Sequence, residues 1–228
     1  MKISIIIPVY NSENILPKLI EKITISLNDS LGKEPYEIIL VNDCSKDNSW
    51  QVIKELKKKY ENLKCFSLMN NVGQHNSIMA GLKQSSGEII ITMDDDLQHS
   101  PDSIKYLLEG LNEGFDVCYS KFKKQKHNLW KKVGSWFNDK MANLLYKKSA
   151  DVYLSSFKAM KRSIVNEIIK FEGPYVYIDG LILNTTRNIC TVSVEHFDRL
   201  NGKSNYTLRK SISLWLIMVT SFSTTPLR

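Results

Sequence analysis

Three consecutive carboxylates close one of the apolar runs of this sequence. Asp94, Asp95 and Asp96 follow the run Ile89–Met93, and Gln98 stands two residues further on. Adjacent acids repel one another at neutral pH, and a bound cation relieves that repulsion. Two carboxylates separated by one residue reach one hard cation, with phosphate oxygens completing its shell. The pattern predicts a metal site, and its bland alternative is a cluster that caps the helix after it.

Polar residues also follow two other apolar runs, Ile3–Val9 and Tyr36–Val41. In an open parallel sheet, ligands bind beyond the carboxyl ends of the strands. The residues at these ends therefore predict a ligand pocket: Pro8, Tyr10, Asn11, Asn42 and Asp43. The alternative for Pro8 and Tyr10 is that they only end the strand and bind no ligand.

No glycine-rich phosphate loop accompanies this pocket. The sequence has neither GxGxxG after its first apolar run nor GxxxxGK[ST] anywhere. Dehydrogenase and P-loop functions are therefore excluded, and a nucleotidyltransferase is disfavoured because its Gly-rich start is also missing. Phosphates must be held by a metal ion and by side chains.

The elements that must position these residues alternate between strand and helix. Continuous β-branched runs predict strands that are buried on both faces, and helical periodicity lies between them. This alternation predicts an α/β domain around a mainly parallel sheet. The predicted strands cover 3–9, 36–41, 63–68, 88–93 and 116–119, and the predicted helices carry 16–23, 47–59, 75–84, 101–111 and 128–146.

Composition limits the partners. The 228 residues carry a net charge of +7, and six lysines fall between Lys121 and Lys132. This segment and the amphipathic helix Asn128–Tyr146 predict contact with an anionic membrane surface, or else a solvated loop and a packed helix. The four cysteines lack metal-ligand or redox spacing, which favours reduced thiols in the cytoplasm.

No apolar run of the sequence reaches the 18 residues that a membrane span needs. The run Ile212–Phe222 is too short to cross a bilayer, and the chain stops soon after it. We expect a piece cut from a longer protein. The predicted units are a catalytic domain over 1–205 and an apolar, membrane-proximal extension over 206–228.

Four motifs in order resemble family 2 glycosyltransferases of the GT-A fold. They are IIPVYN at Ile6–Asn11, VNDCSKD at Val41–Asp47, NVGQHN at Asn71–Asn76 and MDDDLQ at Met93–Gln98. The Gly-Gln-His-Asn variant looks most like the polyprenyl-phosphate branch, together with Arg199, Gly202, Lys203 and Ser204 and the closing Thr-Pro-Leu-Arg. That branch includes dolichyl-phosphate mannose synthases and undecaprenyl-phosphate sugar transferases. The resemblance implies transmembrane helices after this point, because many members of the branch continue into them. His75 in this segment is either a site residue or a capping or packing residue.

The resemblance implies a role for each matched residue. Pro8, Tyr10 and Asn11 would line the base and ribose pocket, where Asp43 would hydrogen-bond the base. Asp94 and Asp95 would bind the nucleotide sugar. The ligands of the metal, Mg²⁺ or Mn²⁺, would be Asp94, Asp96 and Gln98. Asn42 replaces the usual Asp, so the base identity stays open.

The acceptor side is assigned by the same resemblance. Arg199 and Lys203 would contact phosphate, although they also fit an ordinary basic turn. For a catalytic base the sequence offers Asp151, which precedes Ser156-Phe157-Lys158, and Asp179. A polyprenyl phosphate is already anionic at neutral pH, so electrostatic positioning can supply most of the rate.

We therefore expect a metal-dependent, inverting transferase that moves a sugar from a nucleoside diphosphate sugar to a polyprenyl phosphate at the cytoplasmic membrane face, in the synthesis of cell-envelope glycans. The alternatives are transfer to a soluble or glycan acceptor, and a nucleotide-sugar binding module without turnover. No nucleic-acid partner is expected, and a homo-oligomer is compatible with the sequence.

Overall fold

The computed structural model describes residues 2–31, 35–122, 153–173 and 175–195. Within them, seven strands form one sheet in the order β3-β2-β1-β4-β6-β5-β7. The strands are β1 (Ile3–Val9), β2 (Tyr36–Asn42), β3 (Leu63–Ser67), β4 (Ile89–Thr92), β5 (Val117–Phe122), β6 (Lys158–Lys161) and β7 (Ile189–Val194). Only β6 runs against its neighbours among these strands. The predicted α/β fold with a mainly parallel sheet is confirmed.

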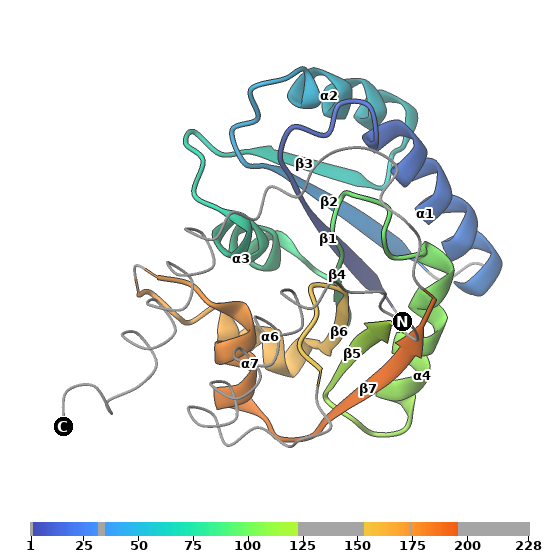
Figure 1. Cartoon of the computed structure of the whole chain (residues 1–228), viewed down its shortest axis with the longest axis vertical. Helices are drawn as coiled ribbons and strands as arrows, with labels where there is room; N and C mark the ends of the chain where they lie inside the picture. The colour runs from blue at the N-terminus through green and yellow to red at the C-terminus, as the bar shows by residue number, and fades with distance from the viewer. Residues whose placement is uncertain (1, 32–34, 123–152, 174, 196–228) are drawn as a thin grey trace, which may run out of the picture.

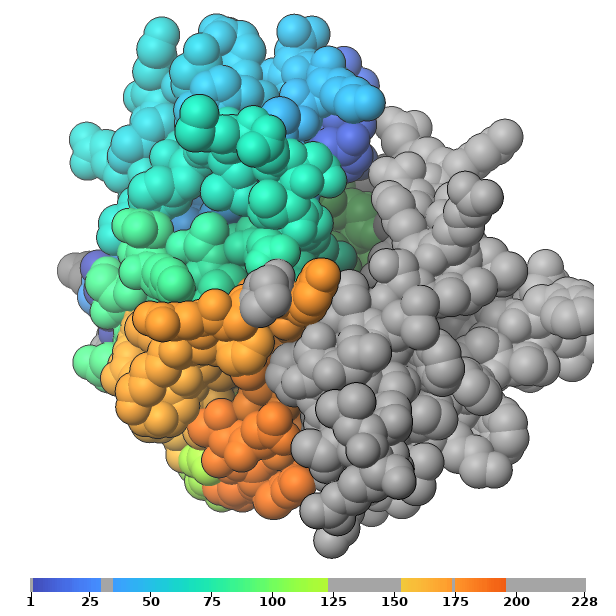
Figure 2. Space-filling view, turned by 90° about the vertical axis from the view of Figure 1, so that its left-hand side faces the viewer, coloured from blue at the N-terminus to red at the C-terminus, as the bar shows by residue number. Residues whose placement is uncertain are grey.

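Helices cover both faces of the sheet (Figure 1). One face carries α1 (Leu16–Leu31), α2 (Ser49–Lys59) and α4 (Ile104–Asn112), which follows the short 3₁₀ turn Pro101–Ser103. The other carries α3 (Gln74–Gln84), α6 (Arg162–Ile168) and α7 (Ile178–Thr185). Figure 2 shows the outer side of this second layer.

The central strand explains why its sequence is an uninterrupted apolar run. All residues of β1 are buried. Ile5 and Ile7 pack with α1, whereas Ile6 points to the opposite face and packs with α3. Successive side chains of a strand point to opposite faces, so a strand covered on both sides needs apolar residues at almost every position.

The elements predicted from periodicity are present with small shifts at their ends. The helix predicted from Pro101 begins as a 3₁₀ turn, and the strand predicted to end at Tyr119 continues to Phe122. The sequence prediction missed four elements in the second half, which are β6, α6, α7 and β7. The predicted helix over 128–146 and the domain boundary at 205/206 lie outside the described residues.

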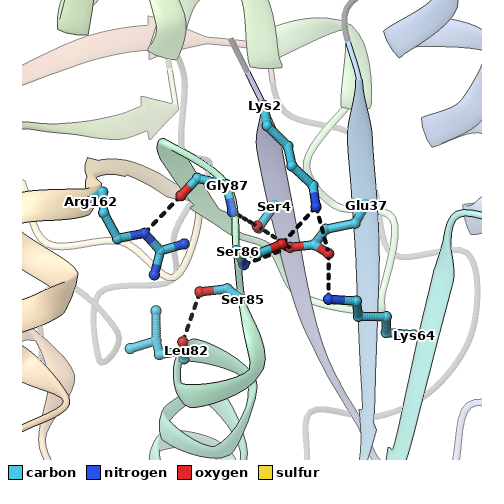
Figure 3. Close-up of polar contacts among 9 residues, drawn as sticks. All are labelled: Lys2, Ser4, Glu37, Lys64, Leu82, Ser85, Ser86, Gly87 and Arg162. Carbon is cyan, nitrogen blue, oxygen red and sulfur yellow. Dashed lines mark hydrogen bonds and ion pairs between the residues drawn. The ribbon is translucent and has the colours of Figure 1, made fainter.

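A buried acid ties the amino ends of the strands together (Figure 3). One oxygen of Glu37 accepts hydrogen bonds from the Ser4 hydroxyl at 2.6 Å and the Ser86 amide at 2.7 Å. The other lies 2.7 Å from the ammonium of Lys64 and 3.6 Å from that of Lys2. Burial alone would raise the pKa of Glu37, but the bonds from Lys64, Ser4 and Ser86 outweigh it and lower the pKa to about 2.

The same corner reaches α6 through the turn before β4. The Gly87 amide donates to the Ser4 hydroxyl at 2.8 Å, and the Gly87 carbonyl accepts from Nε of Arg162 at 2.7 Å. Polar groups of β1, β2, β3 and α6 thus meet at one point, at the sheet edge opposite to the polar strand ends (Figure 3).

Replacing Glu37 by Gln should lower the free energy of unfolding by roughly 2 kcal/mol at pH 7, since charge-assisted hydrogen bonds are lost. The folded-state pKa lies below the ordinary value of 4.5, so this stabilisation is present above pH 4.5 and is lost as pH falls toward 2. Urea denaturation at pH 7 and pH 3 measures both effects. The difference in free energy of unfolding between Glu37→Gln and the parent should be smaller at pH 3 than at pH 7. Glu88→Gln, at an exposed position, should unfold with the same free energy as the parent at both pH values. An equal difference for Glu37→Gln at both pH values would contradict this account.

Candidate active site

The polar strand ends predicted from the sequence meet at the carboxyl edge of the sheet. In the registers of β1 with β2 and β4, Val9 pairs with Asn42 and Ile6 pairs with Thr92. These three neighbouring strands therefore release their loops at the same edge. The crevice beyond such an edge is where open α/β sheets bind ligands.

Asp94 is the most tightly held acid of this edge. Its Oδ1 accepts from Nε2 of Gln74 at 2.6 Å, and its Oδ2 accepts from the hydroxyl of Ser156 at 2.5 Å. Burial raises the pKa of Asp94 to about 6, and the charges of Asp96 and Asp95 act in the same direction. Asp94 thus joins β4 to the start of α3 and to the segment before β6.

Asp95 points back to the loop after β1. Its Oδ2 accepts from the backbone amide of Tyr10 at 3.2 Å and from the hydroxyl of Ser12. Burial raises the pKa of Asp95 to about 6, although both bonds act against that rise. Asp95 therefore positions the backbone at Tyr10. This role does not depend on any contact that Asp95 makes to a substrate.

Asp96 sits in a tight turn with 8% of its surface exposed. Its Oδ1 accepts from the backbone amide of Gln98 at 3.0 Å, and Leu97 between them has a left-handed φ of 60°. The turn folds Gln98 back toward Asp96. The predicted metal ligands Asp94, Asp96 and Gln98 thus lie in one loop.

Asp43 anchors the loop that leads into α3. Its two oxygens accept from the backbone amides of Val72 at 2.8 Å and Gly73 at 2.9 Å. Gly73 has φ of 86°, a region that glycine adopts freely. α3 starts at the next residue, Gln74, which holds Asp94. Asp43 is therefore linked to the acidic loop through one short segment of backbone.

Asn11 joins the loops after β1 and β2. Its Oδ1 accepts from the backbone amide of Lys46 at 2.7 Å, and its own amide donates to the hydroxyl of Ser45 at 3.0 Å. Asn11 has φ of 56°, which asparagine tolerates better than most residues. Pro8 lies within β1, where it pairs with Val41. The structure thus brings together all predicted nucleotide-sugar residues at one edge.

A buried ion pair lies behind this edge. The ammonium of Lys158, with 1% of its side chain exposed, lies 2.5 Å from Oδ1 of Asp179 and 5.2 Å from the ring centroid of Tyr119. The Tyr119 hydroxyl donates to the same Oδ1 at 2.8 Å. The sequence prediction used Lys158 only as a landmark. The sequence did contain a clue to the ion pair: Lys158 stands among apolar residues, and Asp179 follows further along the chain.

His75 lies next to this pair on α3. Its ring packs edge-on against Tyr177, with ring centroids 5.2 Å apart. Burial lowers the pKa of His75 to about 4, while the charge of Asp179 raises it and that of Lys158 lowers it. His75 is therefore neutral at physiological pH, and its contact with Tyr177 is the packing alternative that the sequence left open.

Three predicted residues, Asp151, Arg199 and Lys203, lie outside the described residues, as does most of the Lys121–Lys132 segment. Over the ranges that the structure describes, no three or more His, Cys, Asp or Glu side chains form a ready cage for a metal ion. In these same ranges, no helix combines the length and apolarity that a bilayer crossing requires.

The family described as Glycosyl transferase family 2 matches residues 4–169 of the chain. The chain is a family 2 glycosyltransferase. All of it aligns at 37% identity with 69% of a Yersinia enterocolitica protein named undecaprenyl-phosphate 4-deoxy-4-formamido-L-arabinose transferase. A Proteus mirabilis protein of the same name is 34% identical, over the same shares of both chains. The expected polyprenyl-phosphate branch of the family is confirmed.

Solved structures agree on the fold. Glucosyl-3-phosphoglycerate synthase from Mycobacterium tuberculosis, solved with Mn²⁺, UDP and glucosyl-3-phosphoglycerate, superposes with a TM-score of 0.71. The match covers 97% of this chain and 80% of that chain at 18% identity. The GT-A architecture expected from the four motifs is therefore confirmed, and this family 2 glycosyltransferase is an enzyme of the transferase class.

Removing one partner of the buried ion pair should be costly. Lys158→Met leaves Asp179 buried beside an apolar side chain and should lower the free energy of unfolding by about 3–5 kcal/mol. Asp179→Asn removes that stranded charge and still accepts from Tyr119, so Lys158→Met/Asp179→Asn should regain a large part of the loss. A double-mutant cycle by urea denaturation measures the coupling. Strictly additive losses would show that the two residues stabilise the fold independently.

Proposed function

We propose that this glycosyltransferase moves a sugar from a nucleoside diphosphate sugar to undecaprenyl phosphate or a similar polyprenyl phosphate. The observation that carries the proposal is the match of the whole chain to 69% of proteins named as undecaprenyl-phosphate sugar transferases. The convergence of the loops after β1, β2 and β4 at one sheet edge supports it, because a nucleotide sugar needs base, phosphate and sugar contacts side by side.

For the donor, we propose that Pro8, Tyr10, Asn11 and Asp43 line the base and ribose pocket. Asp43 accepts from the amides of Val72 and Gly73, and each carboxylate oxygen can accept a second hydrogen bond. Contact with a base N–H is therefore compatible with its role in holding the loop. Asp94 and Asp95 are proposed to serve the sugar and ribose side.

We further propose Mg²⁺ or Mn²⁺ as the cofactor, held by Asp96 with Asp94 and Gln98. The raised pKa values of Asp94 and Asp95 fit this, because desolvation and the neighbouring acids disfavour their charged forms and a cation would favour them. Mg²⁺ commonly takes one or two carboxylates, with substrate phosphates and water as its other ligands, so a complete protein cage is not needed. A bound cation would neutralise charge on the departing diphosphate.

On the acceptor side, a polyprenyl phosphate oxygen would attack the anomeric carbon in a single displacement, which inverts the configuration. The nucleophile is already an anion, so its orientation matters more than its deprotonation. Arg199 and Lys203 are proposed to contact this phosphate. Asp151 and Asp179 are the proposed bases. The Oδ1 of Asp179 already accepts from Lys158 and Tyr119, which favours a positioning role for this residue.

We also propose that Lys121–Lys132 and the predicted helix 128–146 face the anionic cytoplasmic leaflet. Each exposed basic residue near such a surface contributes about 1 kcal/mol to binding. Binding should therefore weaken with salt and with loss of anionic lipid. A proposed anchor in transmembrane helices would lie beyond residue 228.

The function is tested by incubating the chain with nucleoside diphosphate sugars and a short polyprenyl phosphate, and by following the product with mass spectrometry. A glycosyl polyprenyl phosphate should form with Mg²⁺ or Mn²⁺, and EDTA should abolish it. Asp96→Asn should reduce the rate at least about 100-fold if this carboxylate holds the cation that neutralises the leaving group. The exposed Asp102→Asn is the matched control and should keep the parental rate.

The outcomes separate the alternatives. A product only with a soluble sugar or glycan would replace the lipid acceptor, and tight nucleotide binding without any product would indicate a binding module. Unchanged donor binding in EDTA, measured by calorimetry, would remove the metal from the proposal.

Arg199→Lys should weaken the use of the acceptor more than its conserved charge suggests. The reason is that lysine cannot form the two parallel hydrogen bonds that arginine makes to a phosphate. The apparent KM for polyprenyl phosphate should rise roughly 10-fold, equal to about 1.4 kcal/mol. Donor affinity should stay at the parental value. A fall in donor affinity instead would assign Arg199 to the diphosphate.

A further inference from the structure

Two cysteines lie side by side on the outermost strand pair, away from the acidic loop. β5 and β7 are parallel, and their register pairs Cys118 directly with Cys190. Paired residues of neighbouring strands point to the same face of a sheet, and their Cα atoms lie roughly 4.8 Å apart. Disulfides join Cα atoms separated by about 4.4–6.8 Å. The backbone therefore already has a spacing that a disulfide accepts.

The helix packed over this pair shows that both sulfur atoms lie close to the same point. A Cβ atom on Gly110 of α4 would lie 2.6 Å from Sγ of Cys118 and 2.9 Å from Sγ of Cys190. Glycine inside a helix costs about 1 kcal/mol relative to alanine. Here the missing side chain makes room for the two sulfurs, which border the same small volume under α4.

The two thiols differ in access and in acidity. Cys118 is fully buried, whereas Cys190 is partly exposed on β7, which ends the sheet. The hydrogen bond that Cys118 donates lowers the pKa of Cys190, while the same contact and burial raise the pKa of Cys118. The thiolate is the form that attacks a disulfide, so the lowered pKa makes Cys190, the more exposed residue of the two, the more reactive thiol.

We propose that Cys118 and Cys190 form a modification site at which a small-molecule disulfide oxidises the pair to a cross-strand disulfide. In the first step, the Cys190 thiolate attacks the reagent, its sulfur–sulfur bond breaks, and one thiolate leaves. In the second step, Cys118 gives up its proton to that thiolate and attacks Sγ of Cys190, which expels the second thiolate; this thiolate takes up the proton that Cys190 released when it ionised. The protein loses two electrons and two protons, and one reagent disulfide becomes two thiols.

The site is independent of the proposed transfer reaction, since neither cysteine belongs to the loops after β1, β2 and β4. The spacing in the sequence gave no hint of it, because 118 and 190 are far apart in the chain and become neighbours only through the pairing of β5 with β7. Of the other two cysteines, Cys44 follows β2 and Cys65 lies within β3.

The test uses the full chain carrying Cys44→Ser and Cys65→Ser, so that only the pair can react. The folded protein is incubated with oxidised glutathione, quenched with N-ethylmaleimide and digested with trypsin. Cleavage after Lys105, Lys121, Arg187 and Arg199 leaves the two cysteines on separate peptides. We expect a disulfide-linked peptide pair as the main product, with little glutathione left on the protein.

Two variants check the order of the steps. Cys118→Ser should retain glutathione on Cys190, since the resolving thiol is gone. Cys190→Ser should leave Cys118 at least 10-fold slower to react, because Cys118 has no access to the reagent in the folded state. Stable glutathione on Cys190 of the paired protein would overturn the proposal. Equal reaction rates of Cys118 in Cys190→Ser and of Cys190 in Cys118→Ser would also overturn it, because they would mean that the reaction occurs in unfolded chains.

Discussion

The carboxyl edge of the sheet depends on keeping a run of clustered carboxylates in place. Asp94 and Asp95 sit at the end of β4, where burial raises the pKa of each to about 6. A buried charge is tolerated only when hydrogen bonds or an opposite charge compensate it. Gln74 and Ser156 supply such bonds to Asp94, and Ser12 supplies one to Asp95. The loops after β1 and β4, the start of α3 and the segment before β6 are therefore fixed by their contacts to these acids.

The two edges of the sheet satisfy their charges in different ways. At the amino edge, Glu37 has a lysine at 2.7 Å and several hydrogen bonds, and its pKa falls to about 2. At the carboxyl edge, the hydrogen bonds to Asp94 and Asp95 come from neutral groups, and burial raises the pKa of each to about 6. The first arrangement stabilises the fold by itself. The second would be stabilised by added positive charge, which the proposed Mg²⁺ or Mn²⁺ would supply.

The reversed strand β6 gives the parallel sheet its second polar centre. It lies between β4 and β5 and places Lys158 opposite Thr92. The Thr92 hydroxyl donates to the carbonyl of Ser156, whose own hydroxyl holds Asp94. Lys158 then meets Asp179 of α7, so the acid on β4 and the ion pair behind it are set by one short segment. The charge of Lys158 lowers the pKa of both Asp94 and His75, because it lies near both groups.

Local sequence patterns were enough to predict the alternation of strands and helices, the family, and the residues at the carboxyl edge. Strands buried on both faces leave continuous apolar runs, and residues such as Asn11, Asp43 and Asp96 follow those runs directly. Local patterns of this kind need no knowledge of distant contacts. The second half of the chain was harder, because short elements such as β6 and α7 carry too few residues for a clear period. Three contacts could be found only in the folded chain: Asp43 holds the loop before α3, Lys158 pairs with Asp179, and Cys118 lies beside Cys190. Each of these contacts joins segments far apart in the chain, and strand order and register, which set such contacts, are not written in local residue spacing.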